Sequence, residues 1–360
     1  HELIELCPSL TSIFIHLSIL FFFYYVCMQV LKHINESLIN YFPFFHVFKM
    51  TRVFAGKCRS KARLDGKVAI ITGCNTGMGK EYVMEFYKRG ARVIMACRNL
   101  EKAESALRDI QEQTRGVQNV GEIIVKELDL AKFRSIRKCA DEILASEENI
   151  HLLINNAGYF VGTRELTEDG HEVQFQTNHL GHFLFTMLLL PRIIKSAPAR
   201  IVTIASLAYI GGNGNMHHDD ITLEKSYAPF RAYSRSKLAN MLFSAELARK
   251  LNVTTYSVHP GLIRSGIFQN LDTAGLQLFK RIFLSRYCKI FFKSPRQAAQ
   301  TALHCCLDQE VGKESGLYYC DCKPRKVLKR ARNQDEAQKL WKCSWDAVGL
   351  SRDYNPFVKG

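Results

Sequence analysis

Apolar runs alternate with longer amphipathic stretches along most of the chain, beginning at Asp65. The runs that predict strands are 67–72, 91–97, 122–128, 151–155, 200–205, 253–258 and 316–320. Continuous apolar runs are typical of strands buried on both faces, which form a parallel sheet with helices on each side. The pattern therefore predicts an α/β protein with a doubly wound, Rossmann-type parallel sheet in one domain over 65–350, followed by a C-terminal tail at 351–360.

The first 64 residues follow a different pattern. Residues 11–31 contain no Asp, Glu, Lys or Arg and are about as long as a membrane-spanning helix. A secretory signal peptide has a shorter apolar core and a clear cleavage site, and a buried soluble helix is the other alternative. Residues 38–48 are too short to span and contain Pro43, which favours the membrane interface. We expect 1–64 to be a membrane anchor with a basic juxtamembrane segment.

Charge bears on orientation and partners. Basic residues follow the apolar segment at Lys32, Lys49, Arg52, Lys57, Arg59, Lys61 and Arg63. The positive-inside rule then places the rest of the chain in the cytosol, and we expect the endoplasmic reticulum membrane, with a mitochondrial membrane as the alternative. The formal net charge of +15 leaves nucleic acid, a membrane surface or an anionic cofactor as partners. The 12 cysteines include no C-x-x-C pair and are expected to be reduced thiols.

A glycine-rich turn follows the first predicted strand directly. It reads TGCNTGMGK and contains Gly73, Gly77 and Gly79. Glycines permit a tight turn and let the backbone approach a pyrophosphate at the N-terminus of the next helix. A plain loop is the alternative, but the place between a buried strand and an amphipathic helix favours dinucleotide binding.

The end of the second predicted strand bears on the choice of dinucleotide. An NAD site usually has an acidic residue there to hold the ribose 2′-hydroxyl. This chain instead reads MACRN at 95–99, with no acid and with Arg98. A guanidinium suits a 2′-phosphate, although an exposed arginine at a helix start is the plainer interpretation. We predict NADP(H).

The stretch RAYSRSKLAN, at 231–240, contains Tyr233 and Lys237 four positions apart in a predicted helix. Residues at this spacing share a helical face. A nearby ammonium stabilises a phenolate and would lower the pKa of the phenol from near 10 toward neutrality. The pair therefore predicts a general acid or base, although Y-x-x-x-K also occurs by chance.

Five motifs occur in order: T-G-x-x-x-G-x-G at 72–79, NNAG at 155–158, Ser206, the Tyr233/Lys237 pair and PG at 260–261. Together they make residues 66–320 resemble the short-chain dehydrogenase/reductase superfamily. ACRN, NHLGHF, HPGLIRS and the tail YYCDCK…ARNQDEAQKLW resemble its retinol dehydrogenase branch, which extends the likeness to about residue 350 and includes a membrane-anchored N-terminus. Departures from the usual pattern are Cys74, Met78, Ala205 and Ser265, none of which removes a catalytic group.

The resemblance implies catalytic roles for four side chains. Tyr233 would act as acid in carbonyl reduction and as base in alcohol oxidation. Ser206 would hydrogen-bond the substrate oxygen. Lys237 would lower the pKa of the tyrosine and contact the nicotinamide ribose, and Asn178 would position a water that links Lys237 to solvent. The alternatives are that Ser206 only caps a turn and that Asn178 is satisfied locally.

The resemblance also implies which residues line the cofactor. Besides the three glycines, Arg98, Tyr233 and Lys237, these are Asn75, Thr76, Met78, Asn99, Asp129, Leu130, Asn156, Ala157, Gly158, Pro260, Gly261, Ile263 and Ser265. No metal is required by this chemistry.

Residues 267–292 occupy the place of the variable substrate-covering segment of the family and are rich in aromatics and leucines. They would suit an apolar substrate that arrives through the membrane, although packing on the sheet is an equal alternative. The resemblance suggests retinal and retinol, while other lipid aldehydes and steroids fit as well. A homodimer remains open. A catalytically silent, membrane-bound binding module is the rival of another class, but such relatives usually lose the tyrosine, the lysine or a glycine.

Three other features are interpreted without assigning a site. The histidines and aspartates at 215–220 predict a solvated loop rather than a metal site, since they lack helical spacing. The basic run 323–332 is explained by an anionic membrane leaflet more simply than by nucleic acid. Trp341 and Trp345 are an i, i+4 pair that predicts helix packing.

Overall fold

The computed structural model describes residues 55–211, 216–251, 253–263 and 292–357. Strands form at all seven predicted apolar runs: β1 (Val68–Thr72), β2 (Arg92–Cys97), β3 (Glu122–Glu127), β4 (Leu152–Asn155), β5 (Arg200–Ile204), β6 (Thr254–His259) and β7 (Leu317–Cys320). A short strand β8 (Lys323–Pro324) pairs antiparallel with β7. It was not predicted, because its two residues lie in a basic run without an apolar pattern.

The strands lie in the order β3-β2-β1-β4-β5-β6-β7-β8, and β1 to β7 are parallel. Thr72 is in register with Ala96, and Asn155 with Thr203, so the carboxyl ends of these strands lie along one edge of the sheet. The direction in which successive strands are added to the sheet reverses between the adjacent strands β1 and β4, because β2 and β3 lie on one side of β1 and β4 to β8 lie on the other. A doubly wound sheet opens a ligand-binding crevice at such a switch point.

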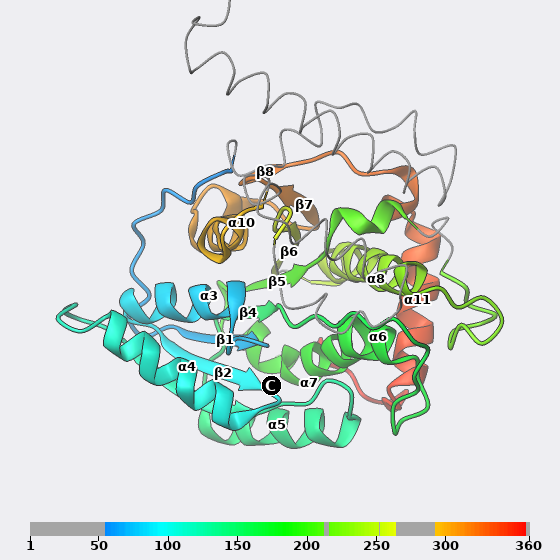
Figure 1. Cartoon of the computed structure of the whole chain (residues 1–360), viewed down its shortest axis with the longest axis horizontal. Coiled ribbons are helices and arrows are strands. Elements are labelled where there is room, and N and C mark those ends of the chain that lie inside the picture. The colour runs from blue at the N-terminus through cyan, green and yellow to red at the C-terminus, as the bar shows by residue number, and fades with distance from the viewer. Residues whose placement is uncertain (1–54, 212–215, 252, 264–291, 358–360) are drawn as a thin grey trace, which may run out of the picture.

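Helices cover both faces of the sheet (Figure 1). One face carries α3 (Gly77–Lys88), α4 (Leu100–Gln113) and α10 (Pro295–Leu307), and the other α5 (Phe133–Ser146), α7 (Gly181–Lys195) and α8 (Pro229–Lys250). Successive strand side chains point to opposite faces, so Ile70 joins the core under α5, α7 and α8 and Ile71 the other core. Both are fully buried, and each such side chain contributes about 1.5–3 kcal/mol. This two-sided burial confirms the predicted parallel sheet.

Shorter elements complete the described chain. They are α6 (Val173–Phe175), the π-helix η3 (Gln176–Leu180) and the 3₁₀ turns η4 (Leu207–Ile210), η8 (Val311–Lys313) and η9 (Lys329–Arg332). The last helix, α11 (Gln334–Ala347), packs against α7 and α8: the Trp341 ring centroid lies 5.1 Å from that of Phe183 and 5.9 Å from that of Phe243. Trp345 also contacts Phe183, at 6.4 Å. The predicted role of the two tryptophans in helix packing is confirmed.

Two predicted segments, the membrane anchor over 11–31 with 38–48 and most of the substrate-covering stretch 267–292, lie outside the described residues. Within the part of the chain that the structure describes, no helix is both long enough and apolar enough to cross a bilayer.

Candidate active site

The glycine turn lies between β1 and α3, as predicted. Gly73 has φ +62°, and a Cβ there would lie 2.8 Å from Cα of Ala157. A Cβ on Gly79 would lie 2.6 Å from Cα of Cys74, whereas Gly77 has open space around it and φ +59°. Gly73 and Gly79 therefore permit close backbone packing, and Gly77 permits the left-handed turn that starts the helix.

The N-terminus of α3 fits an anionic group. Thr76 is the N-cap residue, but its side chain makes no capping hydrogen bond, and the first turn contains no acidic residue. The first N–H groups of a helix have no intrahelical acceptor, and the helix dipole favours negative charge there. Thr76 and Gly77 are exposed, while Asn75 and Met78 are partly buried beside them. The turn thus has the donors and the open space that a pyrophosphate requires.

Thr72 connects the glycine turn to β4. Its Oγ1 accepts hydrogen bonds from the backbone N–H groups of Asn156 (2.9 Å) and Ala157 (3.0 Å). Asn156 Nδ2 donates in return to the carbonyls of Thr72 (2.8 Å) and Gly73 (3.1 Å). These bonds hold the NNAG stretch against the turn across the switch point. Gly158, the next residue, is exposed.

His182 belongs to the same network and was not singled out from the sequence. Its Nδ1 lies 3.0 Å from the carbonyl of Asn178, which can only accept, so Nδ1 carries the proton. Its Nε2, 2.8 Å from Thr72 Oγ1, must then accept from that hydroxyl. Burial lowers the pKa of His182 to about 4, which agrees with a neutral ring. The four-residue spacing to Asn178 was the only sequence signal.

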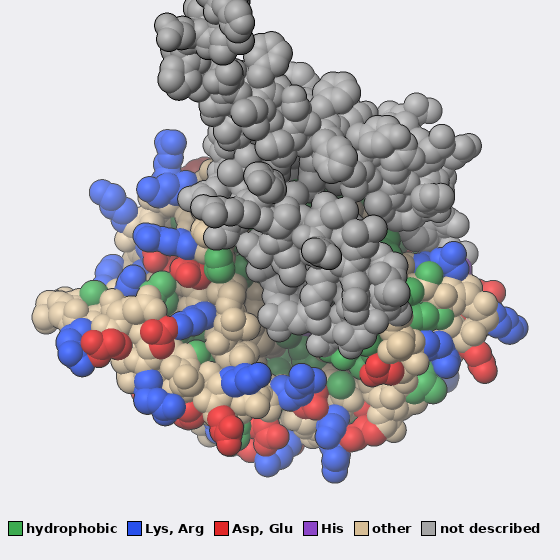
Figure 2. Space-filling view, viewed as in Figure 1, with side chains coloured by type: hydrophobic (Ala, Val, Ile, Leu, Met, Phe, Trp, Pro, Cys, Tyr) green, Lys and Arg blue, Asp and Glu red, His purple; other side chains and the backbone are tan. Residues whose placement is uncertain are grey.

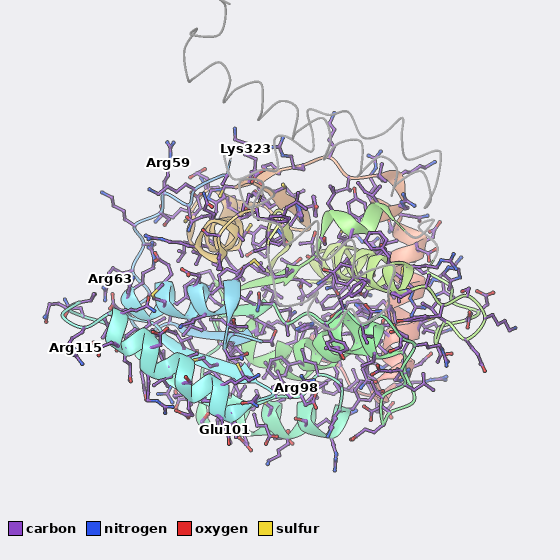
Figure 3. All side chains as sticks on the ribbon, viewed as in Figure 1. Arg59, Arg63, Arg98, Glu101, Arg115 and Lys323 are labelled. Carbon is purple, nitrogen blue, oxygen red and sulfur yellow. The ribbon has the colours of Figure 1, made fainter. Side chains whose placement is uncertain are left out.

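The predicted adenosine-side residues follow β2 and β3, which are adjacent strands. Arg98 is exposed directly after β2, in the lower part of Figure 3, and forms no ion pair with another described residue. Asn99 caps α4, with its side-chain oxygen accepting from the Lys102 N–H at 2.8 Å. Asp129 is partly buried and caps the N–H of Ala131 at 3.1 Å, while Leu130 is buried. The fold brings these residues to one edge, with Arg98 in reach of solvent.

Ser206 and Tyr233 meet at the carboxyl end of β5. Ser206 follows the strand, and Tyr233 lies in the second turn of α8, near enough for the Ser206 side chain to lower the pKa of the phenol. Ser206 Oγ also accepts from the Ala208 N–H at 3.1 Å, so Ser206 does cap the turn, and its predicted hydrogen bond to the substrate oxygen stays a prediction. The ring of Phe160 packs edge-on against Tyr233, with 5.5 Å between centroids.

Lys237 lies on the same face of α8, with Nζ 5.6 Å from the Tyr233 ring centroid. Its Nζ donates to the carbonyl of Ile204 at 3.1 Å, and Asn240 Nδ2 donates to that oxygen at the same distance. The ammonium is therefore held at the end of β5 by a backbone carbonyl.

The pKa values differ from the sequence-based expectation. Burial raises the pKa of Tyr233 to about 12, and the neighbouring Ser206 side chain only partly opposes this rise. Burial lowers the pKa of Lys237 to about 8. The expected fall of the tyrosine pKa toward neutrality is not found, because burial makes the phenolate costly to form.

Asn178 lies in the π-helix η3 and is fully buried. Its Oδ1 accepts from the N–H of Tyr159 at 2.7 Å, and its Nδ2 donates to the carbonyl of Tyr159 and to Ser236 Oγ, both at 3.0 Å. The side chain is thus satisfied locally, which was the alternative to the predicted water-positioning role. It fixes the chain that follows NNAG. Single-turn π segments of this kind are frequent at functional sites.

The PG turn follows β6. Gly261 has φ +97°, and a Cβ there would lie 2.7 Å from the side chain of Lys293. Ile263 forms a parallel bridge with Lys293, whose N–H donates to the carbonyl of Leu262 at 2.8 Å. Pro260 begins this turn, whereas Ser265 lies outside the described residues.

A buried ion pair supports this turn and was missed at the sequence level. Lys293 Nζ donates to Asp321 Oδ1, and the side chains are 1% and 7% exposed. Lys293 precedes α10 and Asp321 directly follows β7, so no local spacing could have paired them. His259, just before the PG turn, accepts from the Leu207 N–H through Nδ1 at 3.2 Å and so connects the turn to the loop of Ser206.

The segment 215–220 is described from residue 216 onward. His218 Nε2 lies 2.6 Å from Glu336 Oε1 of α11. In the described ranges no three His, Cys, Asp or Glu side chains gather in a way that could hold a metal ion.

Comparisons with known proteins agree with this arrangement. A family model described as short chain dehydrogenase matches residues 67–275. The chain belongs to the short-chain dehydrogenase/reductase family. Members of this family are oxidoreductases that use a nicotinamide cofactor, and the uncapped helix N-terminus, the close-packed glycines and the exposed Arg98 fit such a dinucleotide.

Similar sequences place the chain in the retinol dehydrogenase-like branch of this family. It is 45% identical to retinol dehydrogenase 12 of Mus musculus over 298 residues, which cover 82% of this chain and 90% of the relative. It is 43% identical to the Homo sapiens retinol dehydrogenase 12 over 319 residues, covering 87% and 97%. Retinol dehydrogenase 11 of Homo sapiens is also 43% identical, over 302 residues, covering 83% and 91%.

Solved structures show the same fold. An uncharacterized protein from Mycobacterium Paratuberculosis has a TM-score of 0.62 and 30% identity, covering 80% of this chain and 95% of that one. A short-chain type dehydrogenase/reductase from Mycobacterium marinum has a TM-score of 0.55 and 20% identity, covering 71% and 94%. The second likeness concerns the fold alone.

Proposed function

We propose that the chain is an NADP(H)-dependent oxidoreductase that interconverts an apolar aldehyde or ketone and its alcohol, with Tyr233 as general acid and base. The observation that carries this proposal is the placement of Tyr233 beside Ser206 at the carboxyl end of β5, with Lys237 on the same face of α8. Three polar groups gathered at the carboxyl end of a strand suit proton transfer to a carbonyl oxygen.

The protonation state of Tyr233 suits reduction. A pKa of about 12 keeps the phenol protonated at neutral pH, which is the form that a proton donor needs. Ser206 would hydrogen-bond the substrate oxygen as negative charge develops on it. Lys237, with a pKa of about 8, is mainly cationic at neutral pH and would favour the phenolate left after transfer. The nicotinamide, when bound, supplies the hydride.

Cofactor choice rests on the end of β2. The glycine turn and the N-terminus of α3 would hold the pyrophosphate, and Asn156, Ala157 and Gly158 would line the crevice beside them. Arg98 is exposed and unpaired among the described residues, and the stretch 95–99 has no acid to hold a ribose 2′-hydroxyl. Since a guanidinium favours a 2′-phosphate, NADP(H) is the proposed cofactor and reduction the proposed direction.

The substrate is proposed from the apolar surroundings and from the relatives. Phe160 is buried and packs against Tyr233, so the phenol has an apolar wall on one side. The relatives of highest identity are named retinol dehydrogenases. Retinal and retinol are therefore the first substrate pair to examine, followed by other lipid aldehydes and steroids. An N-terminal anchor in the endoplasmic reticulum membrane, with this domain in the cytosol, belongs to the same proposal.

The experiment compares Tyr233→Phe with Tyr256→Phe. Tyr256 is also buried, but its hydroxyl donates to the carbonyl of Val311, at the other end of β6 from the PG turn. We expect Tyr233→Phe to lower kcat for retinal reduction with NADPH by about 10²–10⁴-fold, because a positioned general acid contributes that much. Tyr256→Phe should keep the wild-type kcat. Tyr233→Phe protein that is folded and reduces aldehydes at the wild-type rate would refute the proposal.

Measuring NADPH binding together with turnover distinguishes the proposed enzyme from the rival of another class, a catalytically silent binding module. A catalytically silent module would quench or shift NADPH fluorescence without turning over any retinal, aldehyde or steroid substrate. Turnover of even one of these, lost in Tyr233→Phe, excludes that function.

A further inference from the structure

Two basic segments far apart in the sequence meet at one end of the domain. One, 55–61, leads into the domain, and the other, 321–332, follows β7. Both are fastened to Gln300 of α10: its side-chain oxygen accepts from the Cys58 N–H at 3.1 Å, and its carbonyl oxygen lies 3.5 Å from Cys322 Sγ. Gly56 also packs on the second segment, since a Cβ there would lie 2.3 Å from the carbonyl carbon of Asp321. Figure 3 accordingly shows Arg59 and Lys323 at the same end.

This end carries a set of exposed cations, which we call the basic face: Lys57, Arg59, Lys323, Arg325 and Lys326. Lys and Arg side chains gather along this edge at the upper left of Figure 2. The two segments contain a single acidic residue, Asp321, which is buried and paired with Lys293. The five cations of the basic face are therefore not neutralised by acids of their own segments.

Several cations elsewhere in the described ranges have acidic partners. Arg63 pairs with Asp65, Lys80 with Asp109 and Arg92 with Glu147, whereas no member of the basic face forms an ion pair with a described residue. Exposed cations without partners keep their full attraction for an external anionic surface.

We propose that the basic face binds the surface of an anionic lipid bilayer. Ala55, the first described residue, lies beside this face, so the chain that carries the apolar stretch 11–31 joins the domain here. A basic residue close to an anionic leaflet strengthens membrane association by about fivefold at physiological salt. Five such residues on one face orient the domain as well as attract it.

Nucleic acid is the competing partner for the same charge. Single-stranded nucleic acid is usually bound by aromatic side chains that stack on bases beside a basic groove. Neither 55–61 nor 321–332 contains an aromatic residue. The lipid surface therefore agrees better with the composition of the face. This proposal does not depend on the reaction, since an inactive chain would carry the same face.

The experiment is lysine footprinting of the full chain in vesicles. Neutral phosphatidylcholine vesicles are compared with vesicles that contain about a third phosphatidylserine. A water-soluble acetylating reagent reports the reactivity of Lys57, Lys323 and Lys326, with Lys102 and Lys138 on α4 and α5 as internal controls. We expect the three lysines of the basic face to react about fivefold more slowly on the anionic vesicles, and the controls to be unchanged. The difference should vanish at about 1 M salt, where the Debye length falls to about 3 Å.

A charge variant tests the cooperation between the two segments. Arg59→Gln/Arg325→Gln should lose most of the protection at Lys57 and Lys323, whereas the matched variant Arg108→Gln/Arg134→Gln, with exposed arginines of α4 and α5, should keep it. Carbonyl reduction in detergent should be the same in both variants.

Equal reactivity on neutral and anionic vesicles would overturn the proposal. Protection by inorganic phosphate alone would show a small-anion site instead of a bilayer surface. Protection by a DNA or RNA oligonucleotide, without any effect of phosphatidylserine, would assign the face to nucleic acid.

Discussion

Replacing Lys293 by methionine tests the buried ion pair behind the PG turn. Methionine keeps most of the unbranched stem that lies against Gly261 but removes the ammonium, so Asp321 loses its partner while only 7% exposed. Breaking a buried pair from one side costs about 3–5 kcal/mol, because the remaining charge stays desolvated. For a domain of this size we expect the melting temperature to fall by about 5–10 °C.

The second half of the test restores charge balance. Asparagine can replace Asp321 without a buried charge, and it tolerates the left-handed backbone at this position, where φ is +54°. Lys293→Met/Asp321→Asn should therefore recover most of the lost melting temperature. Because the pair supports the PG turn, Lys293→Met should also raise the KM for NADPH, and the double variant should lower it again.

The assay is thermal unfolding followed by circular dichroism, with NADPH kinetics on the same preparations. The matched control is Lys313→Met. Lys313 and Glu310 also form an ion pair, but their side chains are 70% and 79% exposed, so we expect the free energy of unfolding to change by only about 0–1 kcal/mol. A melting temperature of Lys293→Met equal to that of the control variant would refute the reasoning. Failure of the double variant to recover would assign the loss to packing instead of charge.

Three further predictions concern the cofactor site and Lys237. In steady-state kinetics, Arg98→Ala should raise the KM for NADPH about 10–100-fold and leave the KM for NADH unchanged, since only the 2′-phosphate contact is removed. An unchanged KM for NADPH would exclude the proposed binding of the 2′-phosphate by Arg98. Gly79→Ala should weaken NADPH binding, measured by fluorescence, and lower the melting temperature, because the new Cβ would lie 2.6 Å from Cα of Cys74. The control is Gly116→Ala, where the Cβ would meet open space and should cost only about 1–2 kcal/mol of backbone strain. Lys237 has its pKa lowered by burial from 10.5 to about 8, so the unfolded chain binds more protons between these values and stability rises with pH there. In urea unfolding, the free energy of unfolding of the wild type should therefore rise by about 2 kcal/mol relative to that of Lys237→Met between pH 8 and 10. A difference in unfolding free energy between the two proteins that stays the same across this pH range would contradict this prediction.

Some site features were predictable because they depend on a few neighbouring residues. The glycine turn could be placed between a strand and a helix, because apolar runs mark strands and only glycine fits φ +62° at Gly73 or the contact at Gly79. The shared face of Tyr233 and Lys237 follows from helical spacing alone. A joint role for Ser206 and Tyr233 was expected only from the family resemblance, since the two residues come from different elements.

Other features depend on contacts between distant residues. The tyrosine pKa was expected to fall and instead rises, because burial in the assembled fold disfavours the phenolate. The local bonding of Asn178 with Tyr159 and Ser236 required η3, the loop after β4 and α8 to come together. The four-residue spacing of His182 from Asn178 was compatible with a contact between those two, but no sequence pattern indicated that the ring would also reach Thr72.

The sequence by itself determined the order of strands and helices, the glycine turn and the helical spacing of the tyrosine and lysine, since hydrophobic periodicity and glycine geometry act over a few residues. Only the tertiary structure decided which groups are buried, which partner each polar atom finds and where the two basic segments meet. Those outcomes depend on desolvation and on contacts such as Lys293 with Asp321, which join residues that the chain alone leaves far apart.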